Sequence, residues 1–167
     1  MARARICAVD FDGTLVEHRY PAIGKPLPYA FETLKALKGN GIQLMLWTMR
    51  GHPDLNRFPH IDLHTGKYIL TDTLQEAVDF CKEQGVEFDG VNLSPEQFST
   101  SNKQYAHCYI DDAALGCLLT VDGFVDWEKV LHYLVLRKWV TPDQCWDILG
   151  VYHGHQIPEA PNPNHDL

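Results

Sequence analysis

The fold is decided by the stretch Ile6-Cys7-Ala8-Val9-Asp10-Phe11-Asp12-Gly13-Thr14-Leu15. An apolar run ends here on two aspartates with one residue between them, and a glycine and a hydroxyl residue follow. Such a run predicts a buried strand of a parallel sheet. Both acids then lie at the carboxyl end of the strand, where open α/β sheets bind ligands. Two carboxylates so close repel each other, and a bound cation or a shared proton relieves the repulsion. The stretch therefore indicates an active site.

Strand-like and helix-like segments alternate along the chain, which favours a parallel sheet with crossover helices. The predicted strands are Arg5–Asp10, Ile42–Thr48, Phe88–Leu93 and His107–Asp111, and the predicted helices are Leu27–Lys38, Thr73–Gln84, Asp126–Lys138 and Thr141–Leu149. We expect Thr141 to cap the last helix ahead of Pro142. Residues 1–150 form one predicted catalytic domain, and residues 151–167, rich in proline and asparagine, form a predicted loosely ordered tail.

The segment Gly51–Thr71 delays the helix that follows the second strand and is longer than an ordinary connection. Loops of this length often act as lids, although a surface excursion or a dimer contact fits the sequence equally well. His60 and His64 are four residues apart with Asp62 between them, which is compatible with a zinc site. The segment shows no clear helical periodicity, however, and a tetrahedral site needs converging ligands. We therefore expect solvated histidines here.

The composition describes an ordinary globular chain of 167 residues, with 45% hydrophobic and 22% charged residues. Its net charge of −8 argues against nonspecific nucleic-acid binding. No apolar stretch approaches the roughly 20 residues that span a bilayer, and the run behind Arg3 and Arg5 is too short for a signal peptide. The five cysteines contain no CxxC pair, so we expect reduced thiols and a cytoplasmic protein without a membrane partner.

Further polar residues follow or precede the later predicted strands. Thr48 ends the second strand, and Arg50 follows it two residues later. Lys103 precedes the last strand, which ends at Asp111 and is followed by Asp112. In a parallel sheet these groups meet the two acids of the first strand at one edge. Such a set suits phosphoryl transfer through an aspartyl phosphate, with Mg²⁺ as a hard cation that takes oxygen ligands. A second acid can protonate the leaving oxygen and then activate water.

Asp10-x-Asp12-Gly13-Thr14, followed by Thr48, Lys103 and Asp111-Asp112, resembles the four motifs of the haloacid dehalogenase-like (HAD) superfamily of phosphatases and phosphotransferases, in the same order. The resemblance spans residues 5 to about 120. It implies an α/β fold with a Rossmann-like parallel sheet and helices on both faces.

The resemblance also implies a role for each matching residue. Asp10 would be the nucleophile, and Asp12 would be the general acid/base that also lends its backbone carbonyl to Mg²⁺. The expected metal-binding residues are Asp10, Asp12, Asp111 and Asp112, the last as a ligand or as a partner of the ligands. The expected phosphate-binding residues are Gly13, Thr48, Arg50 and Lys103, with Thr48 and Lys103 also counted as catalytic. Lys67 is the one rival that we consider for Lys103.

The two points at which this family inserts a cap domain are short here, at Val16–Pro26 and Ser94–Asn102. The chain thus resembles cap-less members, which act on large substrates or gain a cover as homo-oligomers. The strings Leu46-Trp47-Thr48-x-Arg50 and Tyr109-Ile110-Asp111-Asp112 are similar to those of small bacterial proteins assigned as hydrolases. We expect a Mg²⁺-dependent phosphomonoester hydrolase that acts on a phosphorylated small molecule.

Three other functions share parts of this pattern. A phosphotransferase would share the first half-reaction, and the sequence does not separate it from a hydrolase. A catalytically idle phosphate-binding or scaffold protein would retain the same residues without turnover. A receiver-type signalling domain is disfavoured, because its acid pair belongs on the first strand, before its threonine and lysine, whereas Asp111-Asp112 comes last here.

Overall fold

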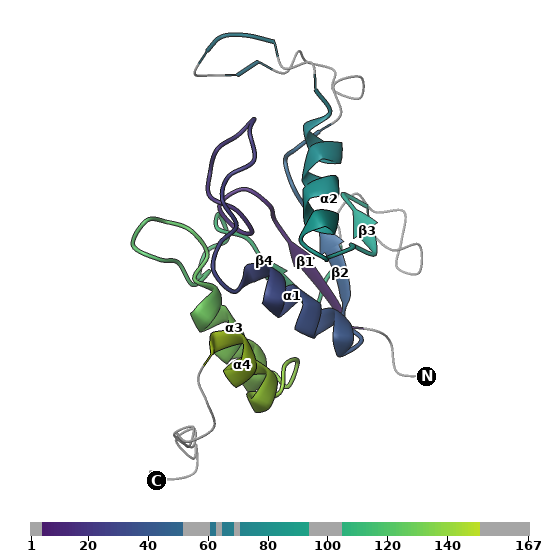
Figure 1. Cartoon of the computed structure of the whole chain (residues 1–167), viewed down its shortest axis with the longest axis vertical. Coiled ribbons are helices and arrows are strands. Elements are labelled where there is room, and N and C mark those ends of the chain that lie inside the picture. The colour runs from purple at the N-terminus through teal and green to yellow at the C-terminus, as the bar shows by residue number, and fades with distance from the viewer. Residues whose placement is uncertain (1–4, 52–60, 63–64, 69–70, 94–104, 151–167) are drawn as a thin grey trace.

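The structure is a computed structural model that describes residues 5–51, 61–62, 65–68, 71–93 and 105–150. Its sheet consists of β1 (Ile6–Val9), β2 (Gln43–Leu46), β3 (Gly90–Val91) and β4 (Cys108–Ile110). All neighbouring strands are parallel, and their order in the sheet is β3-β2-β1-β4 (Figure 1). The predicted Rossmann-like α/β arrangement is confirmed, and each predicted strand contains one of the four observed strands.

Four helices accompany the sheet: α1 (Ala30–Gly39), α2 (Thr73–Glu83), α3 (Trp127–Leu136) and α4 (Pro142–Leu149). Helix α1 begins at Ala30, three residues after its predicted start at Leu27. Pro28 disfavours the helical conformation of the residue before it, and Tyr29 takes a left-handed conformation with φ 66°. The predicted cap of the last helix is confirmed, because the Thr141 side chain accepts a hydrogen bond from the backbone N–H of Gln144 in a capping box.

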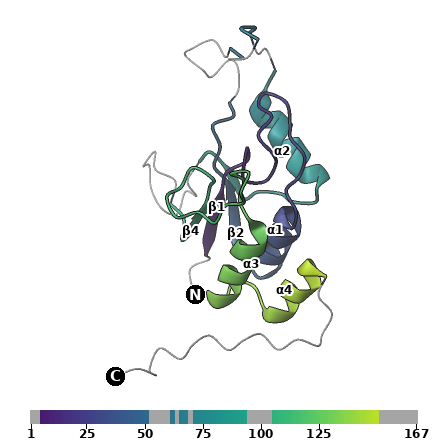
Figure 2. The ribbon, with the colours of Figure 1, turned by 90° about the vertical axis from the view of Figure 1, so that its left-hand side faces the viewer.

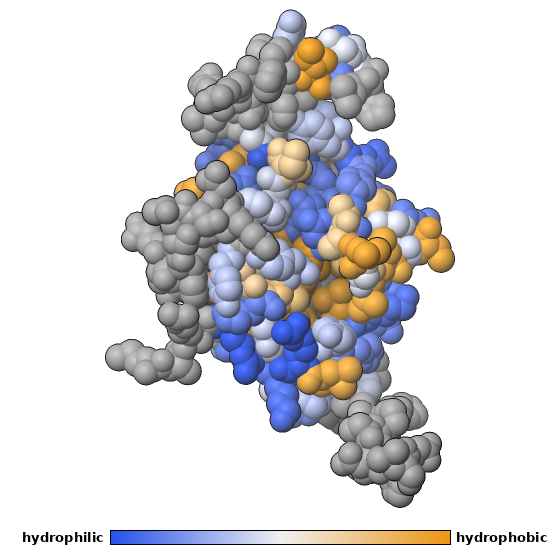
Figure 3. Space-filling model, turned by 180° about the vertical axis from the view of Figure 1, so that it is seen from behind, coloured by the Kyte–Doolittle hydropathy of each residue, from blue (hydrophilic) through white to orange (hydrophobic). Residues whose placement is uncertain are grey.

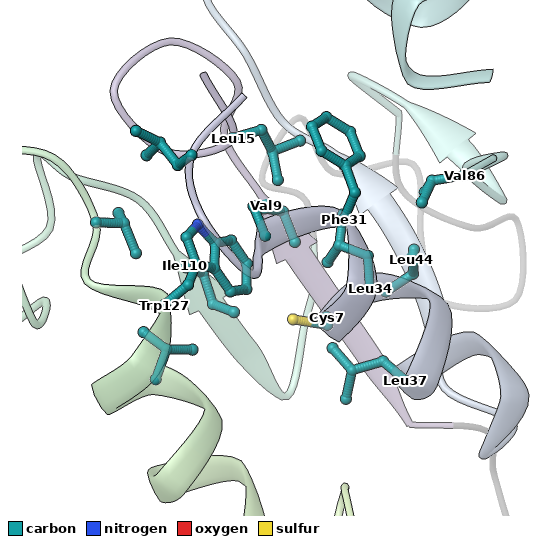
Figure 4. Packing of buried hydrophobic residues seen from close by; sticks show 14 of the residues in the cluster. Cys7, Val9, Leu15, Phe31, Leu34, Leu37, Leu44, Val86, Ile110 and Trp127 are labelled. Carbon is teal, nitrogen blue, oxygen red and sulfur yellow. The ribbon is translucent and has the colours of Figure 1, made fainter. Parts of the chain in front are cut away.

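The main core lies between one face of the sheet and all four helices. Alternate strand residues such as Cys7, Val9 and Leu44 point into it, as the period of a strand requires (Figure 4). Figure 2 shows the helices together on this side of the sheet. The opposite face carries a smaller cluster of Ile6, Ala8 and Met45, with Trp47 and Ala106 packed against it. In the described part of the chain, helices thus cover one face rather than both.

The second face of the sheet turns toward the viewer in Figure 3, where apolar groups lie between hydrophilic ones.

No helix among the described residues is long and apolar enough to cross a membrane. All five cysteines are free thiols, as the sequence predicts. The predicted tail, most of Gly51–Thr71 with its three histidines, and Lys103 lie outside the described residues.

The strand order creates a switch point beside β1. The chain passes from β1 to β2 and then to β3 on one side, and it returns to β4 on the other side. In open α/β sheets, ligands bind at such a point, outside the carboxyl ends of the strands. The residues that directly follow β1 and β4 therefore lie at the expected position for a site.

Candidate active site

Three carboxylates form a cluster, here called the acidic corner, where β1 and β4 end side by side. Asp10 follows β1 directly, and its backbone N–H donates to the carbonyl of Ile110 at 3.0 Å. Asp111 and Asp112 follow β4, and one carboxylate oxygen from each of the three aspartates lies within 4.8 Å of those of the other two. Parallel pairing of the two strands thus brings together acids that are about one hundred residues apart in the sequence. A set of oxygen donors like this one could hold a hard divalent cation.

The electrostatics of the acidic corner act most strongly on Asp10. The pKa of its carboxyl is raised to about 7, chiefly by burial and also by the charges of Asp111, Asp112 and Asp12, against one opposing backbone hydrogen bond from Phe11. Like charges and desolvation both disfavour the carboxylate form. Because the described residues of this corner are acids, a cation would relieve both penalties.

Hydrogen bonds from the turn after β1 support the acidic corner. The Thr14 hydroxyl lies 3.5 Å from Oδ2 of Asp10 and 3.4 Å from Oδ1 of Asp112, and it accepts the backbone N–H of Asp112 at 3.1 Å. The indole Nε1–H of Trp127 donates to the Thr14 carbonyl at 2.6 Å, so α3 braces the turn. Trp127 is buried in the core.

Gly13 gives this turn its conformation. Its φ of 79° belongs to the left-handed region, which favours glycine. A Cβ at this position would overlap the ring of His18 and lie 2.7 Å from Oδ2 of Asp112. Its backbone N–H donates to the carbonyl of Val16 at 2.7 Å. This amide thus has an acceptor within the turn, and the predicted phosphate-binding role of Gly13 stays a prediction.

Asp12 has a different environment, here called the arginine corner. The guanidinium of Arg50 donates through Nε to Oδ2 of Asp12 at 2.7 Å and through Nη2 to Oδ1 at 2.8 Å. Both carboxylate oxygens thus have a charged partner, in the bidentate geometry that suits arginine. The Asp12 carboxylate does not belong to the acidic cluster. The carboxylates of the four expected metal-binding acids therefore form a cluster of three and one separate pair with Arg50. The expected contact of the Asp12 backbone carbonyl with Mg²⁺ stays a prediction.

Arg50 also differs from its prediction as a phosphate-binding residue. It further donates through Nη1 to the carbonyl of Pro21 at 3.0 Å and through Nη2 to that of Ala22 at 2.8 Å. Four of its five N–H groups thus have protein acceptors. The residue is 2% exposed, although it borders the cleft. Its donors are committed to Asp12 and to the loop at residues 17–26, so we revise its role.

Thr48 lies at the carboxyl end of β2, as predicted. Its backbone N–H donates to Oδ1 of Asn92 at 2.9 Å, and its hydroxyl accepts the backbone N–H of Arg50 at 3.2 Å. Asn92 directly follows β3 and takes a φ of 50°. The sequence analysis did not identify it, although a polar residue at the end of a predicted strand was a usable signal.

The two corners and Thr48 border one cleft of about 880 Å³. Its lining residues are Asp10, Asp12, His18, Tyr20, Trp47, Thr48, Met49, Arg50, Asn92, Asp111, Asp112 and Ala113. His18 and Tyr20 come from the 17–26 loop and were missed by the sequence analysis, because no local pattern marks them. Nε2 of His18 lies 2.9 Å from Oδ2 of Asp112, and this contact ties the loop to the acidic corner. Lys67 is not among the lining residues.

The fold and the site define an α/β protein with an open parallel sheet and a carboxylate cluster at its switch point. No family model and no curated protein matches the chain. A solved structure of a conserved protein from Bacteroides thetaiotaomicron is similar to it, with 33% sequence identity and a TM-score of 0.57. The match covers 86% of this chain and 98% of that chain. At this identity and coverage, the chain belongs to the same family as the conserved Bacteroides protein.

Proposed function

We propose that this protein is a Mg²⁺-dependent phosphomonoester hydrolase of the HAD type that acts through an aspartyl phosphate on Asp10. The observation that carries the proposal is the separation of the two acids after β1. Asp10 lies in a cluster with Asp111 and Asp112, whereas the carboxylate of Asp12, which lines the same cleft, is held by Arg50. A nucleophile beside a metal-binding set and a second acid for proton transfer are the two parts that this reaction requires.

In the first half-reaction, an oxygen of the Asp10 carboxylate attacks the phosphorus atom, and the ester bond to the leaving oxygen breaks. Asp12, which enters this step in its protonated form, donates its proton to that oxygen, so the leaving group departs as a neutral alcohol. The Thr48 hydroxyl borders the cleft at the end of β2, and there it can donate to a phosphoryl oxygen. A preorganised donor of this kind stabilises charge that develops in the transition state.

In the second half-reaction, Asp12 accepts a proton from a water molecule, which attacks the phosphorus atom of the aspartyl phosphate. The acyl phosphate bond breaks, the Asp10 carboxylate is restored and inorganic phosphate leaves. The same residue thus acts first as an acid and then as a base, and each cycle returns it to its initial protonation state.

The donor set of the acidic corner fits Mg²⁺. Asp10, Asp111 and Asp112 would hold the ion, since all three offer the carboxylate oxygens that hard cations prefer. Such an ion supplies positive charge that lowers the repulsion between the carboxylates and the phosphate. The raised pKa of Asp10 supports this assignment, because the site disfavours its own negative charge without a cation.

We further propose a phosphorylated small molecule as the substrate and the cytoplasm as the compartment. The cleft of about 880 Å³ is of the size that holds a small molecule. The five thiols are unpaired with one another by disulfides, which suits a reducing compartment.

The test is phosphate release from a broad panel of phosphomonoesters, with Mg²⁺ and with EDTA. We expect release that depends on Mg²⁺ and disappears in Asp10→Asn. Asp143→Asn is the matched control, since it makes the same chemical change in the first turn of α4, outside the cleft. Release that Asp10→Asn retains would contradict the mechanism.

A parallel assay with an added acceptor alcohol separates hydrolysis from transfer. A hydrolase yields inorganic phosphate whether or not the alcohol is present. A phosphorylated acceptor as the main product would replace the hydrolase with a phosphotransferase of the same family. Binding of phosphate without any turnover would favour the catalytically idle alternative.

A further inference from the structure

We propose that Arg50 is a positioning residue that holds the Asp12 carboxylate in place for proton transfer, an inference that rests on the proposed function. The observation is the double contact from Nε and Nη2 of Arg50 to the two carboxylate oxygens, at 2.7 and 2.8 Å. Two parallel hydrogen bonds fix the orientation of a carboxylate as well as its distance. A single hydrogen bond would leave the carboxylate able to rotate toward the acidic corner or toward solvent.

The arginine is itself held rigidly, so it can serve as a fixed reference for Asp12. Its side chain is 1% exposed, and its guanidinium carbon lies 4.9 Å from the ring centre of Phe11 and 5.3 Å from that of Tyr20. The two contacts to the backbone carbonyls of residues 21 and 22 fix it from the other side. The position of Asp12 is thereby tied both to the end of β2 and to the 17–26 loop, which borders the cleft.

The charge pattern explains why such a tether is needed. Asp12 follows Asp10 by two residues, and the negative charges of these two carboxylates repel each other. A buried ion pair contributes little to stability on balance, because the loss of hydration offsets the attraction. Stability alone therefore gives little reason to bury an arginine here. Holding one carboxylate away from a cluster of three others, and facing the leaving oxygen, gives a specific reason.

The experiment compares Arg50→Met and Arg50→Lys with the wild type on two esters of similar shape. 4-Nitrophenyl phosphate has a leaving group that departs readily without a proton, whereas the more basic leaving group of phenyl phosphate needs one. We measure kcat/KM for both esters, because it reports the step that forms the phosphoenzyme. In Arg50→Met we expect a loss of ~10²-fold or more for phenyl phosphate and less than about tenfold for 4-nitrophenyl phosphate.

The conservative variant and a double variant sharpen the comparison. We expect Arg50→Lys to recover part of the lost activity on phenyl phosphate, since it keeps the charge but only one contact. Adding Arg50→Met to Asp12→Asn should change the activity on either ester by less than about twofold, because the group that Arg50 positions has lost its function. Arg19→Met controls for the loss of a positive charge near the cleft, since Arg19 is an exposed residue of the same loop.

Equal losses on the two esters, or a further large loss in the Asp12→Asn background, would overturn the inference and assign Arg50 a structural role. Circular dichroism and thermal unfolding show which variants fold. If Arg50→Met does not fold, Arg50→Lys and its combination with Asp12→Asn give the same two comparisons. If the wild type releases no phosphate from any ester, the proposed function falls and the inference falls with it. If the wild type is active and Arg50→Met loses the same activity on both esters, only the inference about Arg50 is overturned.

Discussion

The acidic corner and the arginine corner lie on the same cleft, yet they manage negative charge in opposite ways. In the acidic corner, Asp10 lies with two further acids, and the pKa of its carboxyl is raised to about 7. In the arginine corner, Asp12 has a bidentate partner for both of its oxygens. Among the described residues, Asp10 is therefore left among like charges, whereas both carboxylate oxygens of Asp12 have a charged partner.

This difference teaches how two neighbouring acids acquire different tasks. Asp10 and Asp12 are the same residue type and are separated by one position, so their intrinsic chemistry is identical. The neighbouring strands make the two environments different. The end of β4 brings acids to Asp10, whereas the end of β2 brings an arginine to Asp12. A metal-assisted nucleophile and a positioned acid/base follow from that asymmetry in the proposed reaction.

The largest expected effect distinguishes the two acids by turnover. Asp10→Asn should reduce phosphate release by at least ~10⁴-fold, because the nucleophile is lost. Asp12→Asn should reduce it by ~10²–10⁴-fold, since only proton transfer is lost. Steady-state assays at saturating Mg²⁺ measure both values. A larger loss in Asp12→Asn than in Asp10→Asn would reverse the assigned roles.

A second expectation separates the corners by metal affinity. Asp111→Asn removes one carboxylate of the cluster and should raise the Mg²⁺ concentration for half-maximal thermal stabilisation by at least about tenfold. Asp12→Asn should leave that concentration within about twofold, because the Asp12 carboxylate is bound to Arg50 and its backbone carbonyl is retained. Thermal unfolding across a Mg²⁺ titration provides the measurement. If the two variants lost Mg²⁺ affinity equally, Asp12 would belong to the same metal site as the acidic corner.

The third expectation concerns stability in EDTA as a function of pH. The raised pKa of Asp10, about 7 when folded against about 4 when unfolded, means that the folded state binds more protons between these values. Wild-type stability should therefore fall as the pH rises through this window, and Asp10→Asn should lack this loss. Above pH ~7 we expect the variant to be more stable by roughly 2 kcal/mol, after discounting for partial exposure.

Urea unfolding of both proteins across the window measures this difference. The gain of the variant should shrink toward zero as the pH falls to about 4, where the wild-type carboxyl is also neutral. Saturating Mg²⁺ should abolish or reverse the gain, since the ion favours the charged form. A gain that does not change with pH would mean that the substitution acts through packing and not through charge.

The smallest expected effect concerns the hydrogen bond from Trp127 that supports the turn after β1. Trp127→Phe removes the indole N–H that donates to the Thr14 carbonyl, and the variant should lose about 1–2 kcal/mol of unfolding free energy. Phosphate release should change little, because no cleft residue is altered. Trp146→Phe, in the half-buried part of α4, is the matched control and should cost less. A large loss of activity in Trp127→Phe would show that the turn itself is part of the reacting geometry.

Much of the acidic corner could be predicted from the sequence, because its logic is local. Each acid directly follows an apolar run, and parallel strands bring their carboxyl ends to one edge. The same reasoning located Thr48. Lys103 lies outside the described residues, so its predicted role stays a prediction.

The arginine corner could not be predicted in the same way. Arg50 follows Thr48 by two residues, which suggested a role toward phosphate, but the direction of its side chain depends on residues that are 28 to 38 positions away. His18 was missed for the same reason, since its partner follows another strand, whereas Asn92 directly follows a predicted strand and offered a local signal. Local periodicity describes strands and helices, and it carries no information on such long-range polar pairs.

The most direct test of the central claim is detection of the aspartyl phosphate itself. Wild-type protein is mixed with Mg²⁺ and the best ester of the panel, quenched in acid, digested and examined by mass spectrometry. The account predicts one phosphoryl group on Asp10, which is removed by hydroxylamine and absent from Asp10→Asn. Phosphate release in the wild type without a phosphoryl group on Asp10, at any time of quenching, would contradict the account.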